Sequence, residues 1–120
     1  MKDANASKAR FLKDPLERRI GNLASDFSRL EWLCTHPNES SGLGNLFREM
    51  KHFTEWVAQD APLDVQETMG DLQVRVAMWD QIWPRLGKTK PFRNAVAREA
   101  HTWSNKLLKL SSRISRSEKH

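Results

Sequence analysis

The sequence predicts an all-helical (all-α) protein, folded as a single antiparallel four-helix bundle with up-down-up-down order. Three observations predict this fold. Hydrophobic residues recur at alternating steps of three and four in four segments, helix-terminating residues separate these segments, and no segment shows the period-two alternation of a β-strand. The 120 residues fit one domain. We therefore expect residues 1–120 to form one helical-bundle domain, with an N-terminal arm at 1–13 and a frayed basic tail at 115–120.

The first helix is predicted to begin after Asp14-Pro15 and to end before Pro37. Asp14 can cap the free amides of the first turn, and Glu17 can complete a capping box. The hydrophobic seam of this helix consists of Leu16, Ile20, Leu23, Phe27, Leu30 and Cys34. Because Cys34 lies on the seam, we expect a buried small hydrophobe rather than a reactive thiol.

The second helix is predicted to follow the turn-forming residues 38–44 and to end at 60–62. Its seam consists of Leu43, Leu46, Met50, Phe53 and Val57. The third helix is predicted to start with an acidic capping box at 64–67 and to end or kink at Pro84, with Gly87 as a natural stop. Its seam consists of Val65, Met69, Leu72, Val76, Trp79, Trp83 and Leu86.

The fourth helix is predicted to begin at 89–91, and its seam consists of Phe92, Val96, Ala100, Trp103, Leu107, Leu110 and Ile114. Connections of roughly three to eight residues favour antiparallel neighbours, because short loops cannot cross a bundle. Within the N-terminal arm, residues 4–13 can add a helical turn or two, with Ala6, Phe11 and Leu12 as the only apolar anchors.

The net charge of +5 is unevenly divided along the chain. Residues 1–19 hold six basic and three acidic side chains (net +3), residues 20–86 hold five and ten (net −5), and residues 87–120 hold nine and two (net +7). In an up-down-up-down bundle the first helix begins at the same end at which the fourth helix finishes. We call this end the basic pole, and we expect the acidic loops and the middle helices to point elsewhere.

The basic pole is the candidate site for nucleic acid or another polyanion. Its predicted binding residues are Lys8, Arg10, Lys13, Arg18, Arg19, Lys106, Lys109, Arg113 and Arg116. The serines of segment 111–117 add hydroxyl groups that suit phosphate contacts. An alternative reading is that these cations only complement helix dipoles and keep the protein in solution.

The five tryptophans divide into two groups. Trp79, Trp83 and Trp103 lie on the hydrophobic seams and are expected in the core. Trp32 and Trp56 lie off or beside their seams, so either is a candidate for an exposed protein interface, with simple cover of the bundle edge as the alternative.

No residue pattern predicts an enzyme, a metal site or a cofactor. Glu49 and His52 have a spacing used in di-metal bundles, but His52 points away from the seam and the chain has no second such pair. No serine lies in a nucleophile elbow, and no glycine-rich phosphate loop is present. The chain shows neither a signal-peptide segment nor an apolar run approaching the length of a membrane span, so we expect a cytoplasmic protein without membrane contact.

These observations predict a non-enzymatic binding module that contacts nucleic-acid phosphates through the basic pole, as a small subunit of a larger assembly. The sequence does not distinguish DNA from RNA. The alternative function is a protein-protein adaptor or scaffold, in which the exposed tryptophans and the basic pole meet an acidic protein.

Overall fold

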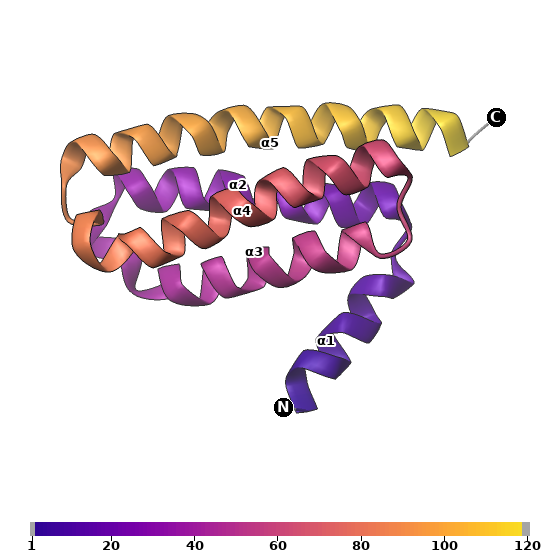
Figure 1. Ribbon diagram of the computed structural model, residues 1–120, viewed down its shortest axis with the longest axis horizontal. Coiled ribbons are helices and arrows are strands. Elements are labelled where there is room, and N and C mark those ends of the chain that lie inside the picture. Colours follow the sequence, from indigo (N-terminus) through magenta and orange to yellow (C-terminus); the bar gives the residue numbers. More distant parts are fainter. Residues whose placement is uncertain (1, 119–120) are drawn as a thin grey trace.

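The computed structural model describes residues 2–118, and within this range it contains helices and no strand. The elements are α1 (Lys2–Lys13), α2 (Leu16–Thr35), the short 3-10 helix η1 (Pro37–Gly42), α3 (Leu43–Ala58), α4 (Leu63–Leu86) and α5 (Lys90–Glu118) (Figure 1). None of the helices in the described range is both long enough and apolar enough to span a membrane.

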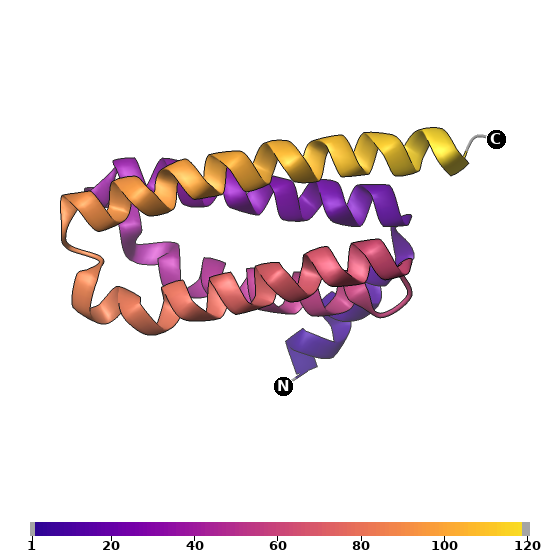
Figure 2. The same cartoon turned by 45° about the horizontal axis from the view of Figure 1, so that its top comes forward.

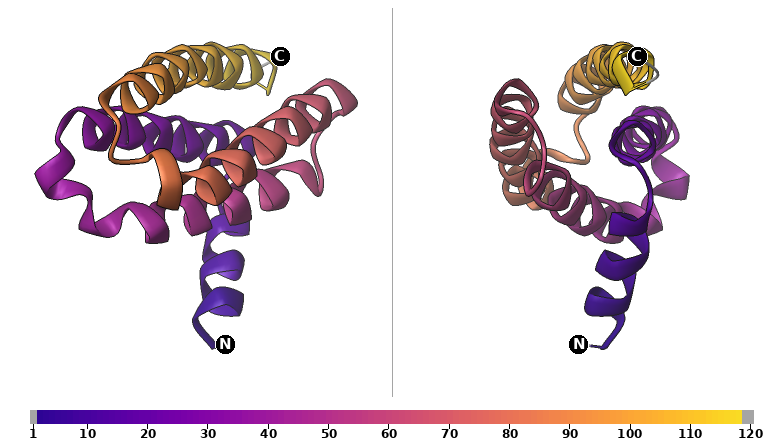
Figure 3. Two further views of the ribbon diagram at one scale, coloured as in Figure 1. Left: turned by 60° about the vertical axis from the view of Figure 1, so that its left-hand side comes forward. Right: turned by 90° about the vertical axis from the view of Figure 1, so that its right-hand side faces the viewer.

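The predicted all-helical fold is confirmed, and each of the four predicted helices is present, as α2 to α5. The single four-helix bundle is not confirmed as the whole architecture, because residues 2–13 form a further α-helix instead of a turn or two. This helix, α1, projects from the body of the molecule (Figures 1 and 3).

The four long helices run side by side and alternate in direction (Figure 1). They form two layers, one made by α2 and α5 and the other by α3 and α4, and α2 also contacts α3 (Figures 2 and 3). The backbones of α4 and α5 lie farther apart, so large side chains fill the space between the layers. Phe27 of α2 and Trp79 of α4, for example, meet there in an edge-to-face contact at 6.3 Å.

The predicted seams supply most of the core, which explains why each segment folds as an amphipathic helix. Ile20, Phe27, Met50, Met69 and Leu107 are among the side chains with no solvent exposure. The expected burial of Cys34 is confirmed, and burial raises the pKa of its thiol to about 12. At the end of its seam Leu86 is 43% exposed, so its expected place in the core is wrong.

The long contact between α2 and α5 includes small residues, of which only Ala100 belongs to a predicted seam. Ala24, Ala100 and Ser104 are buried where the two helices meet. The Ser104 hydroxyl donates to the Ala24 carbonyl at 3.1 Å, and the Ser28 and Ser104 hydroxyls lie 2.7 Å apart. Small side chains let the two backbones approach, and these hydrogen bonds satisfy the buried hydroxyls.

The helix ends differ in detail from the predictions. The caps of α2 and α4 are Pro15 and Pro62, and neither helix has a side-chain capping bond, so both predicted capping boxes are wrong. Pro84 lies within α4, which ends at Leu86 with Gly87 as its cap. The tail expected to fray from residue 115 continues α5 as far as Glu118, and residues 119–120 lie outside the described range.

Candidate functional site

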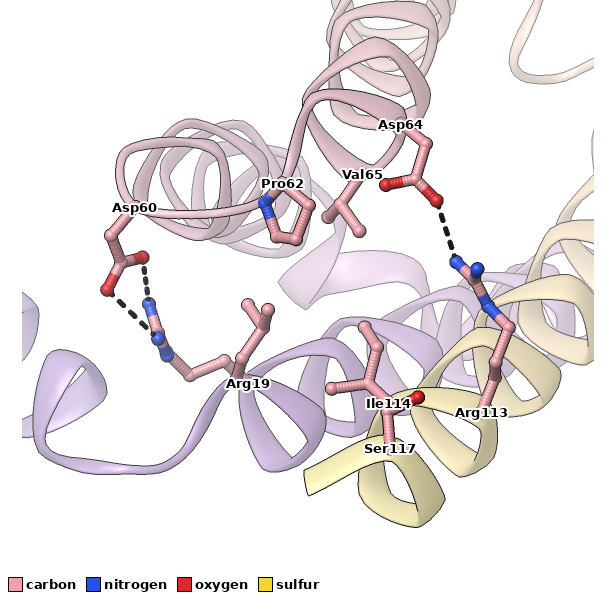
Figure 4. Close-up of a pocket in the computed structure, with 9 residues that line it drawn as sticks. Arg19, Asp60, Pro62, Asp64, Val65, Arg113, Ile114 and Ser117 are labelled. Carbon is pink, nitrogen blue, oxygen red and sulfur yellow. Dashed lines mark hydrogen bonds and ion pairs between the residues drawn. The ribbon is translucent and has the colours of Figure 1, made fainter. Parts of the chain in front are cut away.

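The basic pole joins the start of α2, the end of α5 and the connection between α3 and α4 (Figures 1 and 4). Six predicted binding residues lie on these two helices: Arg18, Arg19, Lys106, Lys109, Arg113 and Arg116. The other three, Lys8, Arg10 and Lys13, lie on α1, which projects from the opposite side of the body from α5 (Figure 1). The structure therefore does not bring all nine cations together.

Arg19 is buried, with 5% of its surface exposed, and it forms part of the fold rather than of the outer surface. Its guanidinium donates to the two carboxylate oxygens of Asp60 at 2.9 and 3.3 Å (Figure 4). It also donates to the Asp14 carbonyl at 3.0 Å. The hydrogen bonding of the Arg19 guanidinium to the Asp60 carboxylate holds the pKa of Asp60 below its usual range. Arg19 thus joins α2 to the α3–α4 connection and does not face solvent as we expected.

Arg113 is paired in a similar way, but at an exposed position. Its guanidinium donates to Asp64 of α4 at 2.8 Å, and this bond lowers the pKa of the Asp64 carboxyl (Figure 4). Between the two ion pairs lies a cavity of about 610 Å³, with apolar walls that include Leu16, Val65 and Ile114. The ion pairs occupy the charged groups beside this cavity, so the cavity itself does not present free cations.

These contacts correct the expectation that acidic side chains point away from the basic pole. Asp60 and Asp64 lie there because an up-down-up-down chain returns its second connection to the end at which its first helix begins. The sequence contains a signal for this, since residues 59–62 form that connection and Asp60 lies within it.

A polar groove between α2 and α5 is the part of the basic pole that presents cations and hydroxyls to solvent. Its volume is about 610 Å³, and it is lined by Glu17, Arg18, Gly21, Asn22, Ser25, Ser111, Ser112, Ser115 and Arg116. Ser111 donates to the Glu17 carbonyl at 2.6 Å and so fixes the end of α5 against α2. Arg18 and Arg116 are exposed on the groove. An anion can therefore meet two arginines and several hydroxyls there.

Lys106, Lys109, Arg113 and Arg116 continue this surface along α5. Their three- and four-residue spacing places them on one side of the helix, over about 15 Å of its length. All four side chains are exposed, and the Lys106 ammonium lies 5.0 Å from the Trp103 ring. The α2–α5 groove and this row of cations together form the candidate site.

The structure separates the two tryptophans that were predicted at an interface. Trp32 is 48% exposed and stacks on His36 at 4.0 Å. Trp56 is only 6% exposed, so its expected exposure is wrong. It packs within the molecule against Phe11 of α1 at 5.6 Å and against Phe53 at 5.9 Å.

A buried acidic pair, which no pattern in the sequence predicts, lies between α2 and α3. Asp26 is 7% exposed, and its pKa is raised to about 9 by burial first and then by its hydrogen bond with Glu49 of α3. Glu49 therefore meets a carboxyl of α2, while His52 stacks on Trp56 at 5.2 Å. Within residues 2–118 no group of three or more His, Cys, Asp or Glu side chains is arranged to hold a metal ion.

Comparison of the chain with protein-family models, with curated proteins and with solved structures finds no match.

Proposed function

We propose that this protein is a non-enzymatic module that binds nucleic-acid phosphates through the α2–α5 groove and the adjoining cations of α5. The observation that carries the proposal is the meeting of Arg18 and Arg116 with the serines of the groove, beside Lys106 and Lys109. Arginines and hydroxyls are typical donors to phosphate oxygens. In this proposal the four long helices act as one up-down-up-down bundle that positions the groove.

The proposed mechanism is electrostatic. Each phosphate neutralised by a lysine or arginine releases condensed counterions, so the affinity falls as the salt concentration rises. Four contacts on a single strand give a slope of about −3 in a plot of log affinity against log salt. Because the proposed contacts are made to phosphates, which are the same in every sequence, we expect little sequence preference from this surface.

The proposal is tested by the fluorescence anisotropy of a labelled oligonucleotide, titrated with protein at low salt and then at increasing salt. We expect Arg116→Glu to weaken binding at least tenfold and to flatten the salt slope. Arg48→Glu is the matched control, because Arg48 is exposed on α3 in the other layer and the change in net charge is equal. Absence of binding at low salt, or an equal loss in both variants, contradicts the proposal.

A protein-protein adaptor is the second candidate function, and the exposure of Trp32 favours it. An aromatic side chain that is 48% exposed is well suited to the centre of a protein interface. This function predicts that an acidic partner is recovered in a pull-down after nuclease treatment and is lost with Trp32→Ala. A partner that disappears with nuclease alone supports the nucleic-acid function instead.

A further inference from the structure

A second basic surface lies at the other end of the molecule, where α4 turns into α5 (Figure 1). Lys88, Lys90 and Arg93 lie there, so the basic segment 87–120 is shared between the two ends of α5. The turn contains a cavity of about 370 Å³, lined by Pro37, Trp83, Pro84, Gly87, Lys88 and Arg93. The lining thus combines an aromatic ring and two prolines with two cations, and it includes no acidic residue.

The indole of Trp83 is held in a defined position in this cavity. The rings of Phe47 and Phe92 pack at angles against it, at 5.6 and 5.4 Å. On another side Gly87 lies so close that a Cβ atom there would overlap the indole. Trp83 is only partly buried, so part of the indole is accessible to a ligand. Because its position is already fixed by these contacts, binding costs little side-chain entropy.

The charges beside the indole favour an anion. Lys88 is exposed, and Arg93 donates to the Gly87 carbonyl at 3.1 Å, which places its guanidinium at the turn. The 29-residue helix α5 begins at Lys90 next to this turn, and the N-terminus of a long helix adds partial positive charge.

We propose that this cavity binds an unpaired nucleobase, which stacks on Trp83 while its phosphate pairs with Lys88. The inference rests on the proposed function and narrows its substrate to single-stranded nucleic acid, because the bases of a duplex are already stacked and paired. Base stacking on an aromatic ring beside cations is the usual means by which proteins hold single strands.

The position of the cavity also determines how long a single strand of nucleic acid must be to contact both the cavity and the α2–α5 groove. α5 has 29 residues and is therefore about 43 Å long. The residues of α5 that line the groove, 111–116, lie about 32–39 Å along this helix from Lys90. A single strand with a helical rise of 3.4 Å therefore needs about ten nucleotides to reach from the cavity to the groove. Arg98, Lys106 and Lys109 are exposed along that path.

The test is a titration with adenosine 5′-monophosphate, followed through the assigned indole N–H resonance of Trp83 in two-dimensional NMR. Ribose 5-phosphate, titrated in parallel, is the probe without a base. We expect the nucleotide to shift the Trp83 resonance in a saturable manner and ribose 5-phosphate to leave it in place. Lys88→Glu, at an exposed site, is expected to weaken nucleotide binding at least tenfold. Arg10→Glu, an equal change of charge at an exposed position of α1 outside the candidate site, is expected to leave it unchanged.

An unmoved Trp83 resonance at saturating nucleotide overturns the proposal, and so does an equal shift with ribose 5-phosphate or an equal loss in both variants. A mononucleotide cannot reach both ends of α5, so this result is independent of the Arg116→Glu experiment. If the nucleotide shifts the Trp83 resonance but Arg116→Glu does not weaken oligonucleotide binding, only the groove proposal is wrong. If Arg116→Glu weakens oligonucleotide binding but the nucleotide leaves the Trp83 resonance in place, only the nucleobase site is wrong.

Discussion

Asp26 is a single buried residue that makes the stability of the fold depend on pH. Its carboxyl faces Glu49 across the α2–α3 contact, with Arg29 as the cation whose field opposes the shift, and its pKa is raised to about 9. At neutral pH Asp26 is therefore protonated, with its carboxyl hydrogen-bonded to Glu49. In the unfolded chain the same carboxyl has its ordinary pKa of 3.8. Between these values the folded state holds a proton that the unfolded state has lost, so a rise in pH favours unfolding.

We therefore predict that the free energy of unfolding declines as the pH rises from about 4 toward 9. Asp26→Asn removes the titrating group but keeps a donor toward Glu49, so this decline becomes shallower and the variant is more stable by roughly 1–3 kcal/mol at pH 8. Urea unfolding at pH 5 and pH 8 measures both effects. Asp71→Asn, at an exposed site on α4, is the control. Equal pH slopes in the wild type and in Asp26→Asn contradict the prediction.

Among the helices, α1 makes the fewest contacts with the other elements. Phe11 is its main anchor, 5% exposed and stacked on Phe53 at 4.3 Å, and Leu12 is partly buried beside it. An isolated helix of 12 residues is marginal in water. The position of α1 thus depends mainly on the contacts of Phe11 with Phe53 and Trp56 of α3, and the second of these covers Trp56.

Phe11→Ala is predicted to release α1 while the other helices keep their structure. Loss of a buried phenylalanine costs about 3–5 kcal/mol, which exceeds what a short helix with one main anchor can supply. We expect amide exchange in residues 2–13 to become fast and the fluorescence of Trp56 to shift to longer wavelength, with little change in the core. Arg10→Ala, on the exposed side of α1, controls for helix propensity. Unchanged protection of residues 2–13 in Phe11→Ala would show that other contacts hold α1.

The elements also show which parts of the fold can be read from the sequence. Ile20, Met50 and Val76 were placed in the core by their spacing alone, because an amphipathic helix has one face to bury. The spacing did not predict α1, since one phenylalanine makes no periodic stripe and its partners Phe53 and Trp56 lie far away in the sequence. Contacts between small residues, such as Ala24 with Ser104, leave no hydrophobic period either.

On the scale of the whole molecule, charge was predicted less well than hydrophobic packing. The sequence correctly suggested that the start of α2 and the end of α5 share one end (Figure 1). It did not show that Arg19 is buried or that Asp60 and Asp64 neutralise part of that end, because ion pairs depend on loop paths and helix rotation. The groove with Arg18 and Arg116 depends on the same details. The surface charges therefore depend on the three-dimensional fold more strongly than the hydrophobic core does.

The two ion pairs that tie the layers together at the basic pole differ in burial, and this difference predicts their energetics. Asp60→Asn leaves the Arg19 side chain, which is 6% exposed, without its charged partner and is expected to cost about 1–3 kcal/mol of unfolding free energy. Asp64→Asn breaks a pair between two exposed side chains and is expected to leave the stability close to that of the wild type. Urea unfolding at pH 7 compares the two variants.

The acid dependence of the same pairs provides a second measurement. Both carboxyl groups have a pKa below their ordinary value of 3.8, Asp60 because of its hydrogen bond from Arg19 and Asp64 because of that from Arg113. Their stabilising contribution is therefore present above about pH 4 and is lost as the pH falls through the lowered pKa values. The difference between the wild type and Asp60→Asn should shrink when unfolding is repeated near pH 2. A difference that is the same at pH 7 and pH 2 would mean that Asp60 stabilises the layers without its charge. Equal costs for the two variants at pH 7 would contradict the argument from the burial of Arg19.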